Sequence, residues 1–190
     1  DLPGSASSFT WSPDGGRYAV ALAPTPLVDD SSTSRDIHVV DAAHGKVQSK
    51  MGSVGKLGSI AFSPDGERIA YIGSVNINDP SEGRLYVVPS FGGERRELVP
   101  EYLGHVGNFI WSDDDSVRWF GSRGVYSEWA TASLYEPQSP GTAPKPGPII
   151  RSVHGNPGQD VVAAIADTPE HPAELYLLRG GAEPVRLTNS

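Results

Sequence analysis

The chain contains no cysteine among its 190 residues. Disulfide bonds, a cysteine nucleophile and cysteine-based zinc sites are therefore excluded within this sequence. Histidines are few as well, and no two of them lie at the i, i+4 or H-x-H spacing of a metal site, nor are they flanked by carboxylates that would complete a ligand set. The five are His38, His44, His105, His154 and His171. We expect no metal ion and no cofactor.

Long apolar runs and clusters of positive charge are also missing. No run approaches the roughly 18 residues that span a bilayer, and the first residues, DLPGSASS, have neither the basic start nor the apolar centre of a signal peptide. The net charge is −8 and the basic residues are scattered. Such a chain offers no electrostatic footprint for nucleic acid or an anionic membrane. We expect a soluble protein, cytoplasmic or periplasmic, with neither of these as a partner.

Turn-forming residues are abundant where hydrophobic residues are not. Hydrophobic residues make up 37% of the chain, beside 22 glycines and 17 prolines. Glycine and proline are poorly tolerated inside helices but useful at corners between short strands. The composition therefore favours an all-β fold.

One hairpin pattern recurs along the chain. AFSPDGERIAYIG, from Ala61 to Gly73, combines a buried strand, a tight turn and a second buried strand. Proline presets φ at the first corner, aspartate bonds nearby backbone N–H groups and glycine accepts a left-handed conformation. The pattern reappears from Thr10 to Leu22 and, degraded, from Ile110 to Gly121. The aromatic residues before the turns, 51 and 49 residues apart, are Trp11, Phe62 and Trp111.

A second landmark follows each turn, namely a short run of β-branched, aliphatic or aromatic residues. The runs begin 48, 49 and 41 residues apart, at Ile37 to Val40, Leu85 to Val88, Leu134 to Tyr135 and Leu175 to Leu178. A further strand after a Gly-Gly turn is expected at Arg95 to Val99 and at Val185 to Thr188. Four strands per repeat of about 40 to 50 residues are typical of a β-propeller blade. We predict one propeller segment with four four-stranded antiparallel blades, at 8–56, 57–107, 108–149 and 150–190.

The third and fourth repeats depart from this pattern. The outer strand of the third falls in Pro137 to Pro148, where repeated prolines remove ladder donors and favour a loop or a frayed edge. The fourth has Asn156 to Asp160 in place of the SPDG turn. A propeller closes about four to eight blades into a ring. We expect remaining blades, from the same polypeptide or from a second copy, to complete this one.

These motifs resemble a known group of propellers. SPDG followed by Arg-Ile-Ala-Tyr, and Leu-Tyr-Val-Val followed by Gly-Gly and Arg, resemble the TolB-like repeat. The segment from Ala166 to Ser190 looks like the final propeller blade of prolyl-oligopeptidase-family serine peptidases, particularly the acylaminoacyl-peptidase and dipeptidyl-peptidase branches. In that family Leu-Thr-Asn, here Leu187 to Asn189, lies just before an α/β-hydrolase domain. The resemblance implies a catalytic domain beyond Ser190, in the same polypeptide.

The catalytic serine motif of such hydrolases has one near match. The motif G-x-S-x-G places its serine on a strand-to-helix turn, and Val88 to Gly93 contains Ser90 followed by two glycines. Val88 stands where the motif has glycine, and no helical pattern follows. We interpret this segment as a hairpin turn, and expect no catalytic residue in the chain.

Two further features have structural interpretations. Asp113 to Asp115 could suggest calcium, but it aligns on the repeated turn and lacks the Glu and Gly pattern of a calcium loop. We expect a solvated turn there. His38 aligns with Tyr86 and Tyr176, which favours an aromatic-sized packing residue over a ligand.

The loops between the second and third strands are the candidate functional surface, because a rigid scaffold positions them. Long insertions are predicted at Ala23 to Arg35, Ser74 to Gly83 and Ser122 to Ala130. The third supplies a guanidinium for carboxylate or carbonyl groups, a carboxylate for an amine, and aromatic rings for apolar side chains. The candidate substrate-binding residues are Arg123, Tyr126, Glu128 and Trp129. The alternative for the two aromatics is packing between blades, and a second candidate, Glu82 with Arg84, is better explained as a surface ion pair.

Three functions remain open from the sequence. The first is a non-catalytic propeller of a prolyl-oligopeptidase-like serine peptidase that gates and helps bind peptide substrates. The second is a TolB-like binding module for a protein or peptide ligand. The third is a propeller fused to a metal-dependent amidohydrolase.

Overall fold

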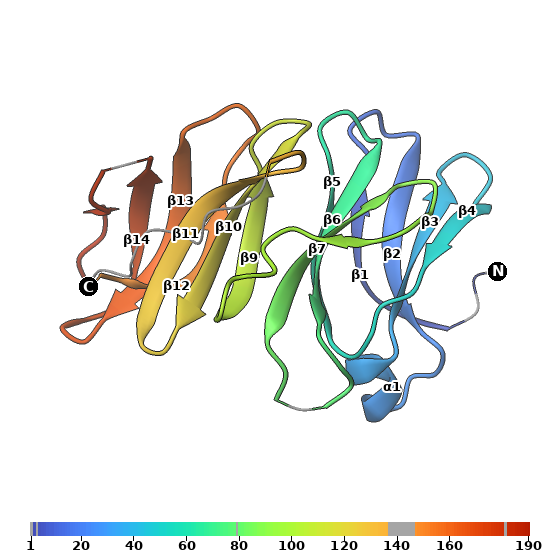
Figure 1. The fold of residues 1–190 in the computed structure, drawn as a ribbon, viewed down its shortest axis with the longest axis horizontal. Coiled ribbons are helices and arrows are strands. Elements are labelled where there is room, and N and C mark those ends of the chain that lie inside the picture. The colour runs from blue at the N-terminus through green and yellow to red at the C-terminus, as the bar shows by residue number, and fades with distance from the viewer. Residues whose placement is uncertain (1, 3, 79, 137–146, 181) are drawn as a thin grey trace. The chain divides into compact units, whose positions relative to one another are not determined.

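The computed structural model describes residues 2, 4–78, 80–136, 147–180 and 182–190. They form four antiparallel sheets, numbered here sheet 1 to sheet 4 in chain order, in which consecutive strands are neighbours (Figure 1). Sheet 1 contains β1 (Ser5–Trp11), β2 (Arg17–Ala23), β3 (Asp36–Asp41) and β4 (Val47–Met51), with the short helix α1 (Val28–Thr33) between β2 and β3. Sheet 2 contains β5 (Leu57–Phe62), β6 (Arg68–Ser74), β7 (Gly83–Pro89) and β8 (Arg96–Glu97). Sheet 3 contains β9 (His105–Trp111), β10 (Ser116–Arg123) and β11 (Tyr126–Ser133), and sheet 4 contains β12 (Ile149–His154), β13 (Val161–Thr168), β14 (His171–Arg179) and β15 (Val185–Arg186).

This architecture confirms the predicted all-β propeller fold with about four blades. Sheets 1, 2 and 4 each have four strands, and the described part of sheet 3 has three. The fourth strand expected for sheet 3 falls on a segment whose residues 137–146 lie outside the described ranges. The outer strands β8 and β15 are two residues long, shorter than predicted.

The repeated SPDG turns owe their shape to their own side chains. The N–H of Gly66 donates to the carbonyl of Ser63 at 2.8 Å, and the Ser63 hydroxyl donates to Oδ1 of Asp65 at 2.5 Å. The turn of sheet 1 repeats both bonds, at 2.9 and 2.5 Å, between equivalent residues. Gly15 and Gly66 have φ of 70° and 74°, which L side chains rarely adopt. Each turn therefore requires its glycine.

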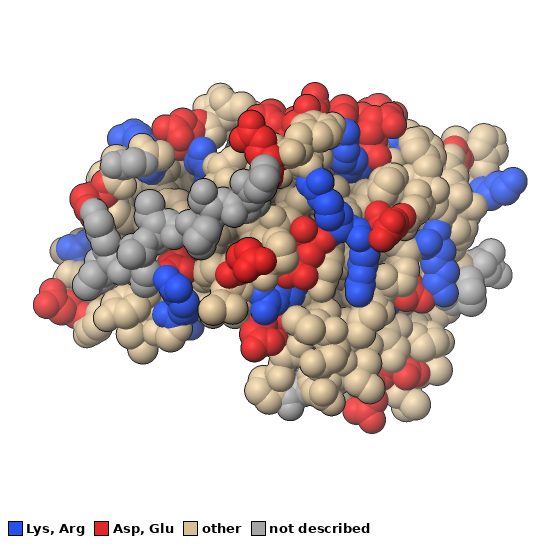
Figure 2. All heavy atoms as spheres, viewed as in Figure 1, with Lys and Arg blue, Asp and Glu red and all other residues tan. Residues whose placement is uncertain are grey.

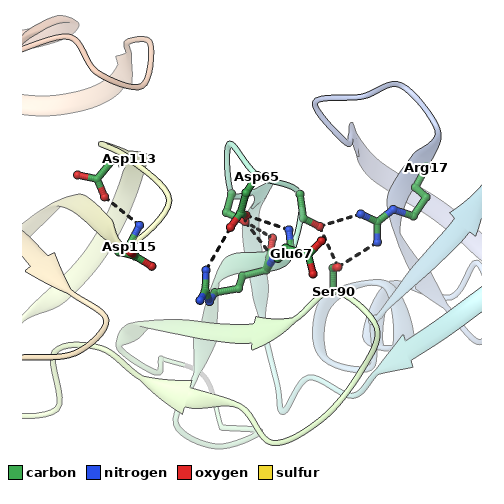
Figure 3. A network of polar contacts seen from close by, with 9 residues as sticks. Arg17, Asp65, Glu67, Ser90, Asp113 and Asp115 are labelled. Atoms are coloured by element: carbon green, nitrogen blue, oxygen red, sulfur yellow. Dashed lines mark hydrogen bonds and ion pairs between the residues drawn. The ribbon is translucent and has the colours of Figure 1, made fainter.

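In the degraded turn before β10, the carboxylate of Asp113 accepts the hydrogen bonds that shape the turn. The backbone N–H of Asp115 donates to Oδ1 of Asp113 at 2.9 Å (Figure 3). The hydroxyl of Ser116 donates to Oδ2 of Asp113 at 2.8 Å. These bonds match the predicted turn. Within the described ranges, no three His, Cys, Asp or Glu side chains gather closely enough to hold a metal ion.

The chain divides into two compact units, residues 1–100 with sheets 1 and 2, and residues 101–190 with sheets 3 and 4. In the first unit, apolar side chains of sheets 1 and 2 form one core, including Ala19, Ile37, Val39, Tyr71 and Val88. In the second unit, sheet 3 contributes Phe120 and sheet 4 contributes Val162, Ala164, Tyr176 and Leu178. Each unit thus has a core between two stacked sheets.

An arginine links the two sheets of each unit. Nη2 of Arg17, on β2, donates to the carbonyl of Gly66 in the turn before β6 at 2.8 Å, as Figure 3 shows. In the second unit, Nη1 and Nη2 of Arg118, on β10, donate to the carbonyl and Oδ1 of Asp160, just before β13, at 3.2 and 3.1 Å. The same relationship, an arginine of one sheet reaching the turn of the next, therefore occurs twice.

Candidate functional site

The four predicted substrate-binding residues lie on a β-hairpin. β10 extends to Arg123 and β11 begins at Tyr126, so Gly124 and Val125 alone connect the strands. The prediction of a long loop over 122–130 was therefore wrong. The small and polar residues of β11 have weak strand propensity, but pairing with β10 along the whole strand overrides it.

The error lies in the placement of the third-strand landmark. In sheet 2, Tyr86 of the third strand pairs with Tyr71 of the second strand. The equivalent pair in sheet 3 is Ala130 with Trp119. Ala130 therefore occupies the position in the third strand that was predicted for Tyr135. The apolar pair at Leu134 and Tyr135 follows the strand instead of starting it. The other two predicted loops do connect second and third strands, the first of them through α1.

Arg123 and Glu128 form the polar centre of the hairpin. Nε and Nη2 of Arg123 donate to Oε1 of Glu128 at 3.1 and 2.7 Å. The side chain of Glu128 is 2% exposed, whereas that of Arg123 is 47% exposed. A buried carboxylate therefore holds the guanidinium in place while part of it faces solvent.

Tyr102 packs beside this pair. Its ring centroid lies 4.5 Å from that of Trp119. A Cβ added to Gly121 would come within 2.8 Å of the Tyr102 hydroxyl, and one added to Gly104 within 2.5 Å of Cζ. Burial raises the pKa of the Tyr102 phenol, and the negative charge of Glu128 raises it further. The phenol thus stays neutral beside the carboxylate.

Tyr126 and Trp129 have opposite surroundings. Tyr126 pairs with Arg123 across the end of the hairpin and is 39% exposed, so the guanidinium and the ring lie on the same face of the sheet. Trp129 packs into the core of the second unit against sheet 4, as the packing alternative for it predicted. Arg123 and Tyr126 can therefore contact a ligand, Glu128 positions Arg123, and Trp129 is structural.

Of the second candidate pair, Glu82 and Arg84, the structure places Arg84 beside Glu97. Nε of Arg84 lies 3.8 Å from Oε1 of Glu97 on β8, and the Arg84 side chain is 15% exposed. The ion pair is thus an inter-strand contact within sheet 2.

On the face drawn in Figure 2, acidic and basic side chains are interspersed.

Ser90 has a structural environment. It lies in the turn between β7 and β8, as predicted, and is fully buried. Its hydroxyl accepts from Nη1 of Arg17 at 3.0 Å and donates to the carbonyl of Gly66 at 2.9 Å. A cation and a carbonyl, with no histidine base among these partners, surround the hydroxyl.

The sequence reasoning missed Tyr102 as a neighbour of the hairpin. A signal was present, because a glycine inside a strand pattern marks the close approach of another group, and Gly121 lies in β10.

None of the helices within the described ranges has the length and hydropathy to cross a membrane.

Comparison with known proteins yields matches among solved structures, whereas no family model and no curated protein matches. A putative TolB from Agrobacterium tumefaciens shares 17% identity with a TM-score of 0.71, over 100% of this chain and 64% of that one. TolB from Acinetobacter baumannii shares 14% identity with a TM-score of 0.67, over 97% and 44%. Pyrococcus horikoshii acylaminoacyl peptidase shares 18% identity with a TM-score of 0.60, over 96% and 27%.

The chain therefore spans less than two thirds of each of these proteins. At such identities the likeness shows the fold alone. It confirms the resemblance that the repeats indicated, and residues 1–190 have the fold of a segment of the β-propellers of TolB and of prolyl-oligopeptidase-type peptidases.

Proposed function

We propose that residues 1–190 are the non-catalytic propeller part of a prolyl-oligopeptidase-like serine peptidase. In this role they gate access to an α/β-hydrolase domain of the same polypeptide and help to bind its peptide substrates. The observation that carries the proposal is the fold shared with an acylaminoacyl peptidase. The ring of such a propeller includes blades beyond the four sheets described above.

The hairpin of sheet 3 supports the binding role. Arg123 is held by the buried Glu128, so little side-chain freedom is lost when its exposed part binds a peptide carboxylate or carbonyl. Tyr126 beside it offers an aromatic surface for an apolar side chain. The two groups suit a peptide that presents both chemistries.

The test uses the complete polypeptide. We expect a fluorophosphonate probe to label one serine outside residues 1–190, with hydrolysis of short peptide substrates. Arg123→Met should raise KM about tenfold with little change in kcat, because it removes binding that is uniform between ground and transition states. Arg179→Met, an exposed cation of sheet 4, is the control and should leave both constants unchanged. Peptide hydrolysis without a labelled serine would contradict the proposal.

The second candidate is a binding module without enzymatic activity. The higher TM-score with the Agrobacterium tumefaciens TolB favours it. It predicts no probe labelling and tight binding of a protein or peptide by the propeller. Hydrolysis that requires a metal ion would instead indicate the fused amidohydrolase.

A further inference from the structure

A β-bulge interrupts the first strand of every sheet at the same place. The register shifts in β1, β5, β9 and β12 leave an extra residue opposite the second strand, and the residues at this equivalent position are Ser7, Gly58, Gly107 and Arg151. Three of them are serine or glycine, whereas sheet 4 has an arginine. A bulge re-aims the side chain of its extra residue and is common beside functional sites. Arg151 is therefore a departure from the repeat at a position suited to function.

The carboxylate beside Arg151 is also unique to sheet 4. Nε and Nη2 of Arg151 donate to Oδ1 and Oδ2 of Asp167 at 2.5 and 3.2 Å. By register, the residues that correspond to Asp167 in the other three sheets carry no charge, namely Ala23, Ser74 and Ser122. The guanidinium and the carboxylate that orients it thus occur together in one sheet, and the packing of the repeat requires neither.

Arg151 and Asp167 line a groove with the β13–β14 turn, residues 168–173. Its volume is about 490 Å³. The side chain of Arg151 is 64% exposed and that of Asp167 is 25% exposed. Within the described ranges, no hydrogen bond engages Nη1 of Arg151, so its N–H groups can donate to a ligand. The turn adds the exposed carboxylate of Glu170 and apolar surface from its two prolines and one alanine.

The groove lies at the same end of the second unit as the β10–β11 hairpin, the lower end in Figure 1. The N–H of Ile150, next to Arg151, donates to Oγ of Ser127 at 2.9 Å, and Ser127 follows Tyr126. Arg151 is also held as Arg123 is, because a carboxylate accepts from Nε and Nη2 of each. One arrangement, an arginine fixed along one edge with Nη1 left for a ligand, therefore occurs twice at this end of the unit.

The charge of the groove discriminates between the acceptor groups of a peptide. Asp167 neutralises the guanidinium of Arg151, and Glu170 adds a negative charge, in a chain of net charge −8. A peptide carboxylate would therefore meet net repulsion in the groove. A main-chain carbonyl is a neutral acceptor for Nη1 and meets no such repulsion. Because the guanidinium is already fixed by two bonds, little side-chain freedom is lost when it binds.

We propose that this groove is a second peptide subsite, in which Nη1 of Arg151 donates to a main-chain carbonyl of the ligand. Asp167 is the positioning residue that orients and neutralises the guanidinium. The same reasoning assigns Arg123, paired with Glu128, to a carbonyl. The ligand class is thus a peptide recognised along its main chain, with no requirement for a free carboxyl terminus. The inference rests on the proposed function for its peptide ligand, and it applies equally to a binding module.

The test measures binding apart from hydrolysis. The complete polypeptide is treated with the fluorophosphonate probe, and calorimetry then gives the Kd of the acetylated hexapeptide Phe-Ala-Ala-Phe-Ala-Ala as its amide and as its free acid. We expect the amide to bind at least as tightly as the acid. Arg151→Met should weaken binding of the amide about tenfold, the cost of one hydrogen bond from a charged donor. Arg179→Met, at an exposed position of β14, should leave the Kd unchanged.

Asp167→Asn tests the neutralising role separately. The amide keeps the shape of the side chain but leaves the charge of Arg151 uncompensated, so the acid should gain about tenfold in affinity relative to the amide of the hexapeptide. A purely structural role for Asp167 would leave this ratio unchanged, and an unchanged ratio would contradict its role as the positioning residue.

Three outcomes would overturn the proposed subsite. They are equal binding of the amide by the unsubstituted protein and the Arg151→Met variant, failure of both hexapeptides to bind, and tighter binding of the acid than of the amide by the unsubstituted protein, which would assign a carboxylate site. Lack of serine labelling together with the expected effect of Arg151→Met would support the subsite and contradict the peptidase function alone.

Discussion

Arg17 of β2 donates from Nη1 to the hydroxyl of Ser90 at 3.0 Å, 73 residues further along the chain. The arginine is 9% exposed, and its guanidinium lies 4.5 Å from the Phe91 ring centroid and 5.6 Å from that of Phe62. Figure 3 shows Arg17 pointing toward Ser90. Neutral oxygens and two aromatic faces thus stabilise the cation between sheets 1 and 2.

Replacing this arginine should loosen the first unit. Arg17→Met keeps most of the packing but removes the charge-assisted bonds to Ser90 and Gly66, at a cost of about 2–3 kcal/mol in the free energy of unfolding. Urea denaturation followed by fluorescence measures it. Lys46→Met, at an exposed position of the same unit, should change stability by less than about 0.5 kcal/mol. An equal effect of the two substitutions would show that Arg17 does not link the sheets.

The two SPDG turns supply a matched pair of glycine substitutions. Gly15 and Gly66 share a positive φ, so Gly15→Ala and Gly66→Ala both carry a strain of about 1–2 kcal/mol. A Cβ at Gly15 meets nothing within 4 Å, whereas one at Gly66 lies 3.2 Å from Nη2 of Arg17. Gly66→Ala should therefore destabilise the protein more than Gly15→Ala in parallel urea unfolding. The excess should vanish in the Arg17→Met background, and an excess that persists would have another cause.

The repeat was predictable because its signals are local. SPDG turns, the aromatics before them and alternating apolar strands determine β1–β2 and β5–β6, and their register agrees with the pattern. β11 was misplaced because its sequence, YSEWATAS, has weak local preference and gains its strand conformation from pairing with β10.

The sequence identified only part of the candidate site, because residue type is a local signal whereas burial depends on tertiary packing. Residue types identified Arg123 and Tyr126, which the hairpin brings together. The other two predicted residues are not available to a ligand in the same way. The buried Glu128 supports Arg123, and Trp129 packs into the core of the second unit. Long-range contacts such as those of Tyr102 and Ser90 depend on tertiary packing, which no local pattern specifies.

Tyr102 should make the second unit sensitive to alkali. Burial first, and then the charge of Glu128, raise its pKa, so the folded state holds the phenolic proton more tightly than the unfolded state. The stabilisation is complete below about pH 10, the ordinary tyrosine pKa, and is lost as the pH rises further. Tyr102→Phe should reduce this alkaline loss, measured as the urea midpoint against pH. Tyr71 and Tyr86, whose pKa values burial also raises, account for the remainder.

Tyr126→Phe is the control for this measurement, because Tyr126 is partly exposed. It should leave the alkaline loss unchanged. If both substitutions reduced the loss equally, burial of the Tyr102 phenol would not be its source.

Glu174 should hold residues 187–190 against β14 in a pH-dependent way. Its carboxylate accepts from the hydroxyl of Thr188, and from the backbone N–H and hydroxyl of Ser190 at 2.6 and 2.7 Å. These bonds, with that from Thr188 first, lower the pKa of Glu174 to about 2. Because the folded-state pKa is depressed, the stabilisation is present above about pH 4.3, the ordinary glutamate value, and is lost as the pH falls toward 2.

Glu174→Gln tests this arrangement at neutral pH. The neutral amide keeps the shape of the side chain but loses the charge-assisted bonds, so residues 187–190 should detach more often from β14. Hydrogen exchange at the N–H of Leu187, which donates to the carbonyl of Leu175 at 2.8 Å, should accelerate. Glu170→Gln, in the exposed β13–β14 turn, should leave that rate unchanged. Acidification of the unsubstituted chain from pH 5 to pH 2 should weaken the protection of Leu187 in the same way, beyond the intrinsic pH dependence of exchange, and equal protection across this range would contradict the role of Glu174.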